Sequence, residues 1–544
     1  MKKINLISIV VLCIIMLAGC AGEPNQEVNI IPQPQSVTVE DGGFTLSPKT
    51  VINVVKGAED LNSACVFFSQ LTEKSFGSRL RVENGDEKNH AVNIIVDPSM
   101  KPEAYDLNVS KKKIDICGGS SKAVFYAMQS LRQMMPIGIE KGEKIDQIRI
   151  QNVRIQDEPR LGYRGTMLDV CRHFFTVDEV KTFIDMLALH KLSVFHWHLT
   201  DDQGWRIEIK KYPNLTKVGS QRKQTVIGKN TGKYDGTPYG PYFFTQEQIK
   251  EVIQYAADRY IMIIPEIELP GHALAALASY PELGCSGGPY DVCQMWGVFP
   301  EVFCPGNEKT FEFWEGVLEE VAELFPSDII HIGGDECPRD EWKKCKKCQA
   351  RMKKENLKQE SDLQNYVVHR IEGFLKSKGK RIIGWDEILE GDVSKTAIVM
   401  SWRGKKGGIE GAKRGNEVIM VPNDYAYFDY YQAKDIANEP FGIGGFVDVA
   451  KVYSLDPTEG LTAEEADKIL GVQANLWAEY ITTFSHAQYM LLPRMAAMAE
   501  VAWTPQAQRD YPNFLNRAKL LMQRYEALGY NFAKHILQEP KVNE

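Results

Sequence analysis

The chain has 544 residues, of which 44% are hydrophobic and 25% are charged, and its formal net charge is −8. This composition excludes a disordered or fibrous chain, and the length allows two to four domains or one large barrel with an accessory domain. The acidic balance argues against a nucleic-acid-binding face, so no nucleic-acid partner is expected.

The first 20 residues have the order of an export signal. Two Lys residues precede an almost wholly apolar run over residues 4–17, which is too short for a comfortable membrane span. The run ends in a Leu-Ala-Gly-Cys motif that resembles a bacterial lipoprotein box, in which Cys20 would be lipidated. We therefore expect a signal peptide at 1–20, a polar tether at 21–28, and an exported protein with a lipid anchor at Cys20, preferably in the outer membrane.

Residues 29–155 are interpreted as a small α+β domain without a catalytic constellation. Short alternating or β-branched runs predict strands over 51–55, 92–96, 105–109 and 113–117, and amphipathic runs predict helices over 58–75 and 121–135. Residues 151–162 are interpreted as a linker that leads into the second domain. That domain would cover residues 156–544.

The second domain alternates between strand and helix patterns. Eight apolar runs predict strands, at 163–170, 192–199, 260–268, 329–336, 381–387, 397–403, 417–422 and 471–479. Eight such repeats predict an α/β fold of the (β/α)8 TIM barrel type, with C-terminal helices. The alternative is an open doubly wound sheet, which is disfavoured because no Gly-rich phosphate motif follows the first strand.

Nearly every predicted strand ends in reactive or aromatic residues. They are Asp169, Arg172, His173, His196, Trp197, His198, Asp201, Asp202, Glu266, Glu268, His272, Asp335, Glu336, Trp385, Asp386, Glu387, Trp402, Arg403, Tyr427, Asp429, Trp477 and Glu479. Active sites of TIM barrels lie at the carboxyl ends of the strands. This pattern therefore predicts one site that is rich in Trp and carboxylates.

Carboxylates beside Trp rings indicate glycoside chemistry, because indole packs on the C–H faces of sugars and a carboxylic acid must protonate the leaving oxygen. Spacing alone does not choose among Glu266, Glu268, Asp335, Glu336, Asp386 and Glu387. Asp335 and Glu336 are sequence neighbours, so they cannot easily flank a sugar from opposite faces. If they are the working pair, substrate-assisted hydrolysis fits, in which a 2-acetamido group supplies the nucleophile.

Seven motifs, in order along the chain, resemble family 20 glycoside hydrolases, which are β-N-acetylhexosaminidases. The motifs are Tyr163-Arg164-Gly165, Leu168 to His173, His196 to Gln203, Pro270-Gly271-His272, His331 to Glu336 with Gly384 to Glu387, and Leu476 to Tyr480. The resemblance implies exo-acting hydrolysis of terminal β-linked GlcNAc or GalNAc with retention, through an oxazolinium intermediate. It implies no cofactor and no metal.

The resemblance also implies roles at matching positions. Glu336 would be the general acid and then the base, with a pKa raised by desolvation; Asp335 would bind the acetamido N–H, and Tyr427 its carbonyl oxygen. Asp201 and His272 would form a relay that supports Glu336. The pocket walls would be formed by Trp385, Trp402 and Trp477. The sugar hydroxyls would be bound by Arg172, Asp429 and Glu479. Arg164 is expected to be structural, and His196 and His198 to lie inside the barrel.

Nine Cys residues lie beyond the leader, and six of them cluster at Cys285, Cys293, Cys304, Cys337, Cys345 and Cys348. Cys345-x-x-Cys348 has the spacing of half a zinc site, but no second pair stands at the usual spacing. Disulfides or free thiols are therefore the favoured interpretation.

Two other functions compete with hydrolysis of terminal sugars. One is a lipid-anchored glycan-binding protein on an inactive barrel, which the intact set of Asp335, Glu336, Tyr427 and Trp residues argues against. The other is an endo-acting chitinase, whose Asp-x-x-Asp-x-Asp-x-Glu ladder is not found in the sequence.

Overall fold

The computed structural model describes residues 28–538. The predicted signal peptide, the lipidated Cys20 and all but the last residue of the tether therefore lie outside the described residues. Within residues 28–538, no helix is both long enough and apolar enough to cross a membrane.

The N-terminal part is a seven-stranded mixed sheet with helices packed on it. The strand order is β1-β7-β5-β6-β4-β2-β3. The strands are β1 (Ser36–Leu46), β2 (Val51–Lys56), β3 (Arg81–Asn84), β4 (Ala91–Val96), β5 (Tyr105–Val109), β6 (Ile114–Gly118) and β7 (Ile148–Asp157), and the helices are α1 (Leu61–Phe76), α2 (Ser121–Met134) and α3 (Gly138–Lys141). The predicted α+β domain is confirmed, and its four predicted strands and two predicted helices are present.

The prediction of a linker over 151–162 is wrong, because most of that segment belongs to β7. This strand pairs antiparallel with both β1 and β5, and Val153 lies opposite Val39 of β1 and Val109 of β5. Ile148, Ile150, Val153 and Ile155 are buried, while Arg149 and Arg154 between them are exposed. The polar residues that suggested a linker are thus the solvent-facing positions of a strand.

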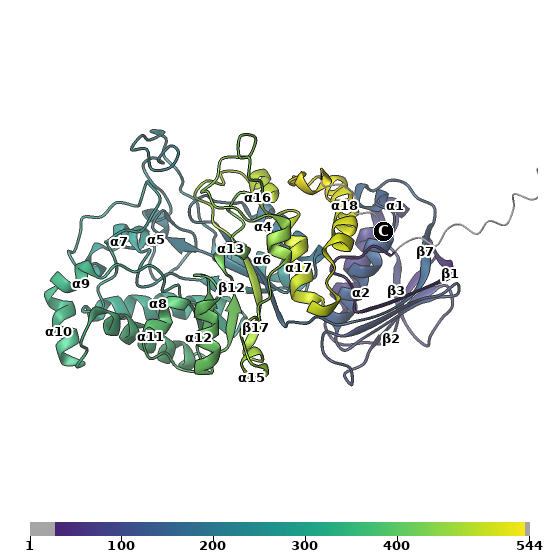
Figure 1. Cartoon of the computed structure of the whole chain (residues 1–544), viewed down its shortest axis with the longest axis horizontal. Coiled ribbons are helices and arrows are strands. Elements are labelled where there is room, and N and C mark those ends of the chain that lie inside the picture. Colours follow the sequence, from purple (N-terminus) through teal and green to yellow (C-terminus); the bar gives the residue numbers. More distant parts are fainter. Residues whose placement is uncertain (1–27, 539–544) are drawn as a thin grey trace, which may run out of the picture.

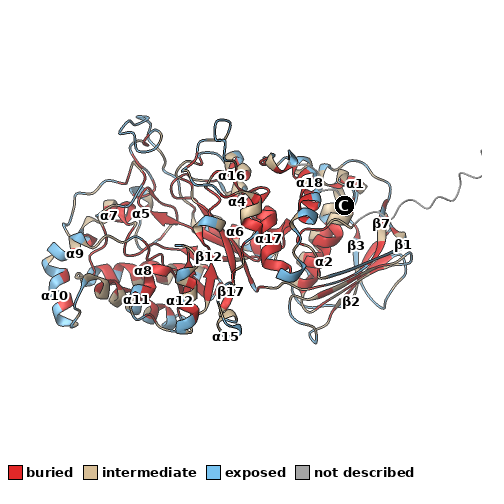
Figure 2. Ribbon diagram, in the orientation of Figure 1, coloured by how far each residue is buried: buried red, intermediate tan, exposed pale blue. Residues whose placement is uncertain are grey.

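Eight parallel strands close into a barrel in the order β12-β13-β14-β15-β16-β17-β8-β9, which excludes the open sheet and confirms the predicted fold. The strands are β8 (Tyr163–Asp169), β9 (Val194–His198), β12 (Met262–Glu266), β13 (Ile329–His331), β14 (Arg381–Trp385), β15 (Ile398–Ser401), β16 (Val418–Met420) and β17 (Ile469–Leu476). All eight coincide with predicted runs. The runs are apolar because barrel strands are covered on both faces, as the burial colours of Figure 2 show.

Helices surround the barrel and extend beyond it. They are α4 (Val177–Leu189), α5 (Asn214–Lys217), α6 (Gln246–Ala257), α7 (Leu274–Ser279), α8 (Glu308–Leu324), α9 (Asp340–Lys344), α10 (Lys346–Lys354), α11 (Glu360–Ser377), α12 (Lys406–Arg414), α13 (Asn423–Ala426), α14 (Val449–Tyr453), α15 (Ala463–Ala466), α16 (Phe484–Leu491), α17 (Arg494–Trp503) and α18 (Tyr511–Leu528). A short hairpin of β10 (Thr200–Asp201) and β11 (Gly204–Trp205) follows β9. Capping boxes at Thr176 and Thr245 fix the first residues of α4 and α6.

The C-terminal helices join the two parts. Figure 1 shows α17 and α18 between the barrel and the N-terminal sheet. Asp157, the last residue of β7, accepts a hydrogen bond from Trp503 Nε1 at 2.9 Å and lies 3.4 Å from Lys191 Nζ. Arg524 of α18 pairs with Glu140 of α3. The barrel is therefore attached to the sheet through buried charged pairs, far from the carboxyl ends of the barrel strands.

Candidate active site

A pocket of about 200 Å³ opens at the carboxyl ends of the barrel strands. Its lining residues are Arg172, His272, Asp335, Glu336, Trp385, Trp402, Tyr427, Asp429, Tyr430, Ile443, Trp477 and Glu479. All the residues for which the resemblance implies a catalytic or sugar-binding role line this pocket except Asp201, which lies behind His272. Tyr430 and Ile443 were not predicted, because neither stands at the end of a strand run.

The loop after β13 turns sharply to present Asp335 and Glu336. Gly333, Gly334 and Glu336 all have positive φ, at 68°, 96° and 46°. A Cβ at Gly333 would overlap the carboxylate of Glu268. Glycine is thus required at Gly333 by both conformation and space, and the strained Glu336 is held where its side chain reaches the pocket.

Gly333→Ala is expected to destabilise the fold by at least about 2 kcal/mol, from left-handed strain and overpacking together. Thermal unfolding of the purified variant measures the effect. Gly334→Ala is the matched control, because it has similar strain but its Cβ would meet only Ile388 Cγ2 at 3.3 Å. Adding Glu268→Ala to Gly333→Ala should restore part of the loss. Equal melting temperatures for the two glycine variants would contradict this explanation.

Asp335 is a buried carboxylate with unused acceptor capacity. Its residue is 8% exposed, and among the described residues no donor lies within hydrogen-bond distance of Oδ1. Burial raises the pKa of Asp335 to about 6; the nearby His272 opposes this rise, whereas Glu266 and Glu336 add to it. The free Oδ1 is suited to accept a hydrogen bond from a ligand that enters the pocket.

The pKa of Glu336 is lowered, whereas the sequence led us to expect that desolvation raises it. The side chain of Glu336 is 42% exposed, and its Oε2 lies 3.7 Å from His272 Nε2. The interaction with His272 lowers the pKa of Glu336, and burial opposes this only partly. Desolvation therefore outweighs the effect of His272 at Asp335 but not at Glu336. Sequence reasoning missed this because the turn at Glu336 directs its carboxylate toward the mouth of the pocket.

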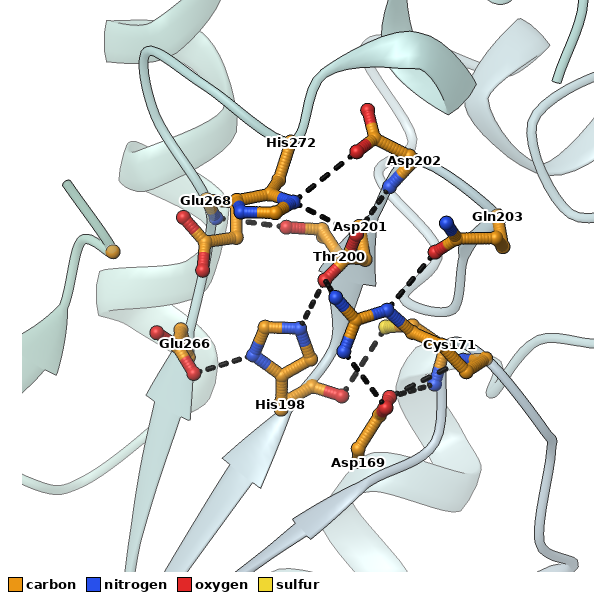
Figure 3. Close-up of polar contacts among 12 residues, drawn as sticks. Asp169, Cys171, His198, Thr200, Asp201, Asp202, Gln203, Glu266, Glu268 and His272 are labelled. Carbon is orange, nitrogen blue, oxygen red and sulfur yellow. Dashed lines mark hydrogen bonds and ion pairs between the residues drawn. The ribbon is translucent and has the colours of Figure 1, made fainter. Parts of the chain in front are cut away.

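His272 connects the two acidic neighbours to a second acidic pair. Its Nδ1 lies 3.1 Å from Asp202 Oδ2 and 3.3 Å from Asp201 Oδ1 (Figure 3). Although burial alone would lower it, the pKa of His272 is raised well above its usual value by the charges of Asp201 and Asp335 and by the hydrogen bonds that His272 donates to Asp201 and Asp202. The predicted grouping of Asp201 with His272 is present, but Asp202, which was predicted at this strand end without a role, is the nearer partner of His272.

Arg172 lines the pocket next to Asp201. Its guanidinium donates to Asp169 Oδ2 at 3.1 Å and to Gln203 Oε1 at 2.9 Å, and it lies 3.0 Å from Asp201 Oδ2. The same group lies 5.1 Å from the ring centre of Trp477. Arg172 is therefore held by carboxylates and an indole face. Glu479 Oε1, which also lines the pocket, lies 3.8 Å from Arg172 Nη1.

Acidic residues that sequence reasoning left unassigned orient the Trp walls. Trp385 Nε1 donates to Glu266 Oε1 at 2.9 Å, and Trp402 Nε1 donates to Glu387 Oε2 at 3.0 Å. Asp386 accepts the backbone N–H of Trp402 at 3.1 Å. Each ring is thus fixed by a buried carboxylate. Burial, with help from Asp335, raises the pKa of Glu387 to about 8.

His196 and His198 lie inside the barrel, as predicted. Both are fully buried and contact Glu266, as does His331, whose Nδ1 lies 2.8 Å from Glu266 Oε1. Glu266 therefore links this histidine cluster to Trp385. Arg164 is structural, as expected, because its guanidinium donates to Lys191 O, Leu161 O and Tyr126 Oη.

Asp429 supplies further unused acceptors in the pocket, which Glu479 also lines. Among the described residues, no donor lies within hydrogen-bond distance of either carboxylate oxygen of Asp429. Burial raises the pKa of Asp429 well above its usual value, and Glu479 adds to the rise; burial likewise raises the pKa of Glu479. Tyr427 stacks on Trp402 with ring centres 6.1 Å apart and planes 13° apart, and completes the wall beside these acids.

A second cavity of about 390 Å³ adjoins the pocket at its mouth and shares Glu336 and Trp402 with it. Arg339, Arg403, Glu387 and Glu390 line it as well. Glu336 therefore stands between a small aromatic pocket and a wider polar cavity. This arrangement suits a group that acts on a bond between two parts of a ligand.

Comparison with known proteins identifies the family. The model described as glycosyl hydrolase family 20, catalytic domain, matches residues 161–506, and the model of domain 2 of that family matches residues 27–158. The chain therefore belongs to glycosyl hydrolase family 20.

Individual relatives agree with this assignment. A beta-hexosaminidase of Porphyromonas gingivalis is 43% identical over 97% of this chain and 68% of its own length. A solved exo beta-N-acetylglucosaminidase of Vibrio harveyi, in complex with N-acetylglucosamine, is 34% identical with a TM-score of 0.83, and covers 93% of this chain and 78% of that one. A solved beta-N-acetylhexosaminidase of Streptomyces coelicolor is 29% identical with a TM-score of 0.82, and covers 96% and 99%.

Proposed function

We propose that this chain is an exo-acting β-N-acetylhexosaminidase that removes terminal β-linked GlcNAc or GalNAc from glycans with retention of configuration. The observation that carries the proposal is the small pocket in which Asp335, Glu336 and Tyr427 meet three Trp side chains. Its volume of about 200 Å³ is below the 300–1,000 Å³ typical of drug-sized ligands, and it suits one sugar residue.

The mechanism starts with the acetamido group of the bound sugar. Asp335 Oδ1 accepts its N–H, and the Tyr427 hydroxyl donates to its carbonyl oxygen. That oxygen attacks C1 while the C1–oxygen glycosidic bond breaks, and the proton of Glu336 passes to the leaving oxygen. The attack is intramolecular, and proximity of this kind is worth about 7–11 kcal/mol in the best cases.

The second half of the reaction reverses the roles. The carboxylate of Glu336 takes a proton from water, the water oxygen attacks C1, and the oxazolinium ring opens to give the retained sugar. Before reaction, the sugar covers the exposed carboxylate of Glu336, removes its water and raises its pKa, so that it holds the proton it must donate. The leaving part of the glycan lies in the wider cavity beside Glu336.

Hydrolysis of aryl β-glycosides tests this function. Aryl β-N-acetylglucosaminide and β-N-acetylgalactosaminide should be cleaved, and a thiazoline mimic of the intermediate should inhibit both reactions. The aryl β-glucoside, which lacks the acetamido group, should be cleaved orders of magnitude more slowly. Saturable binding of the first substrate without turnover would instead support the inactive glycan-binding barrel.

Asp429→Asn is expected to lower kcat/KM about 2- to 10-fold, since a hydrogen bond between neutral groups is worth about 0.5–1.5 kcal/mol. The same variant should change the pH dependence of stability. The folded protein keeps the proton on Asp429 at pH values where the unfolded chain, with a pKa of about 3.9, has lost it. The folded wild type thus binds more protons, and its stability falls as pH rises.

Thermal unfolding at two pH values checks that sign. The variant should have the higher melting temperature at both pH values, and its advantage over the wild type should be larger at pH 8 than at pH 5. A difference that does not change with pH would show that Asp429 is not held protonated by its surroundings.

We also propose that the protein is exported and anchored to the outer membrane by a lipid on Cys20. The support is the charged, apolar and Leu-Ala-Gly-Cys order of residues 1–20. Cys20→Ser should move the activity from the membrane fraction to the soluble fraction and abolish incorporation of labelled palmitate. Unchanged palmitate labelling would refute the site of attachment.

A further inference from the structure

Four cysteine side chains that are far apart in the sequence meet beside the catalytic barrel. They are Cys285, Cys304, Cys345 and Cys348, and their Sγ atoms all lie within 4.8 Å of one another. Cys304 Sγ lies 3.5 Å from Cys348 Sγ and 3.7 Å from Cys345 Sγ, and Cys285 Sγ lies 3.8 Å from Cys348 Sγ. All four are free thiols.

These separations match a metal tetrathiolate rather than disulfides. Zn–S bonds of about 2.3 Å in a regular tetrahedron place the sulfur atoms about 3.8 Å apart. A disulfide needs about 2.05 Å between two sulfur atoms. Cys304 has two sulfur neighbours at nearly equal distance, which a single covalent pair would not produce.

The backbone around the four thiols is fixed by hydrogen bonds. Cys285 and Cys304 follow the two partners of an antiparallel bridge, Gly284 and Phe303. The indole of Trp342 donates to the carbonyl of Phe303 at 2.9 Å, which joins this bridge to α9. The four sulfur atoms are therefore brought together by segments that are already ordered.

The surroundings also suit a charged thiolate centre. Cys304 and Cys348 are fully buried in a small apolar cluster with Val302, Trp342 and Leu363. On the solvent side, Lys344, Lys346 and Lys347 adjoin Cys345 in the sequence and are exposed. Four thiolates and one divalent cation carry a net charge of −2, which is opposite in sign to the charge of these exposed Lys side chains.

We propose that Cys285, Cys304, Cys345 and Cys348 bind one Zn²⁺ ion in a structural tetrathiolate site. On binding, Zn²⁺ displaces the four thiol protons to solvent and forms four Zn–S bonds, with no change in oxidation state. Soft thiolate ligands in a tetrahedral arrangement select zinc over oxygen-preferring cations. All four positions are occupied by protein, so the ion has no open position for catalysis.

The zinc site fastens two loops that supply groups to the sugar pocket. Phe303 N donates to Pro270 O at 3.1 Å, two residues before His272, and α9 and α10 follow Glu336 in the chain. The zinc site stands outside the pocket and does not rest on the proposed hydrolase activity. Cys337, although it belongs to the sequence cluster, is not one of the four ligands.

Metal analysis of the purified full-length chain tests the proposal. Mass spectrometry of the native protein and elemental analysis should find about one zinc per chain. Cys304→Ser and Cys348→Ser should each lose most of it, whereas Cys293→Ser should keep it. Cys293 is a matched control because it is a buried thiol in the same loop, and its Sγ lies 3.3 Å from the carbonyl oxygen of Met295.

A second measurement on the wild-type chain covers the case in which the variants do not fold. Chelation of zinc should expose about four further thiols to a thiol reagent. Co²⁺ added after chelation should give the thiolate-to-cobalt charge-transfer bands and the strong visible bands of a tetrahedral site. A chain without stoichiometric zinc would overturn the proposal, as would disulfides among these four cysteines in alkylated peptides. Neither readout depends on glycosidase activity.

Discussion

Glu336→Gln should lower kcat/KM on an unactivated disaccharide such as chitobiose by about 10²–10⁴-fold, the range that general acid catalysis contributes. Gln cannot donate the proton that the leaving oxygen needs. The loss should shrink on an aryl glycoside whose leaving group is a weak base, because such a group departs without protonation. Initial rates on both substrates, measured with the same enzyme stock, give the comparison.

Glu341→Gln is the matched control, since Glu341 lies nearby on α9 and pairs with Lys344 at the surface. It should keep the wild-type rate on both substrates. A Glu336→Gln enzyme that turns over chitobiose at near-normal rate would remove Glu336 from the acid role. Equal losses on chitobiose and on the aryl substrate would point to misfolding or a binding defect.

Asp335→Asn should lower kcat/KM about 10²–10³-fold, the cost of removing one preorganised electrostatic group. The carboxylate orients the acetamido group through its N–H and stabilises the positive oxazolinium ring, and the neutral amide does neither well. Burial raises the pKa of Asp335 to about 6. Wild-type activity should therefore fall as pH drops through about 6, because Asp335 becomes protonated.

The pH profile of kcat/KM separates this role from a structural one. The acidic limb near pH 6 should be missing from Asp335→Asn, whose residual activity should follow only the remaining groups. Asp340→Asn, at an exposed position on α9, should keep both the wild-type kcat/KM and the acidic limb of its pH profile. An unchanged kcat/KM for Asp335→Asn would contradict substrate-assisted catalysis.

The barrel and most of the pocket could be predicted because their signals are local. A strand buried on both faces is a continuous apolar run, and the first polar residue after it marks the carboxyl end where the pocket forms. Trp385, Trp402 and Trp477 could be assigned to one pocket on this basis. The strand β7 was missed because its exposed positions carry charges, and the resulting alternation was interpreted as a linker.

The remaining features depend on contacts between distant segments, which a linear pattern does not contain. The contact of Asp202 with His272 was missed because only the folded hairpin after β9 directs this carboxylate at His272. The lowered pKa of Glu336 follows from its contact with His272, which lies far from it in the sequence. Likewise, a long loop brings Cys285 and Cys304 to Cys345 and Cys348, so the sequence spacing did not reveal them as the second pair of ligands.

In the proposed mechanism, the acetamido oxygen of the substrate is the nucleophile. The most direct measurement is kcat/KM for aryl glycosides whose acetamido methyl group carries none, one, two or three fluorine atoms. Each fluorine withdraws electrons from the carbonyl oxygen and weakens its attack on C1, so the rate should fall steeply along the series. A rate that stays constant across the four substrates would contradict participation by the acetamido group and require a nucleophile from the protein.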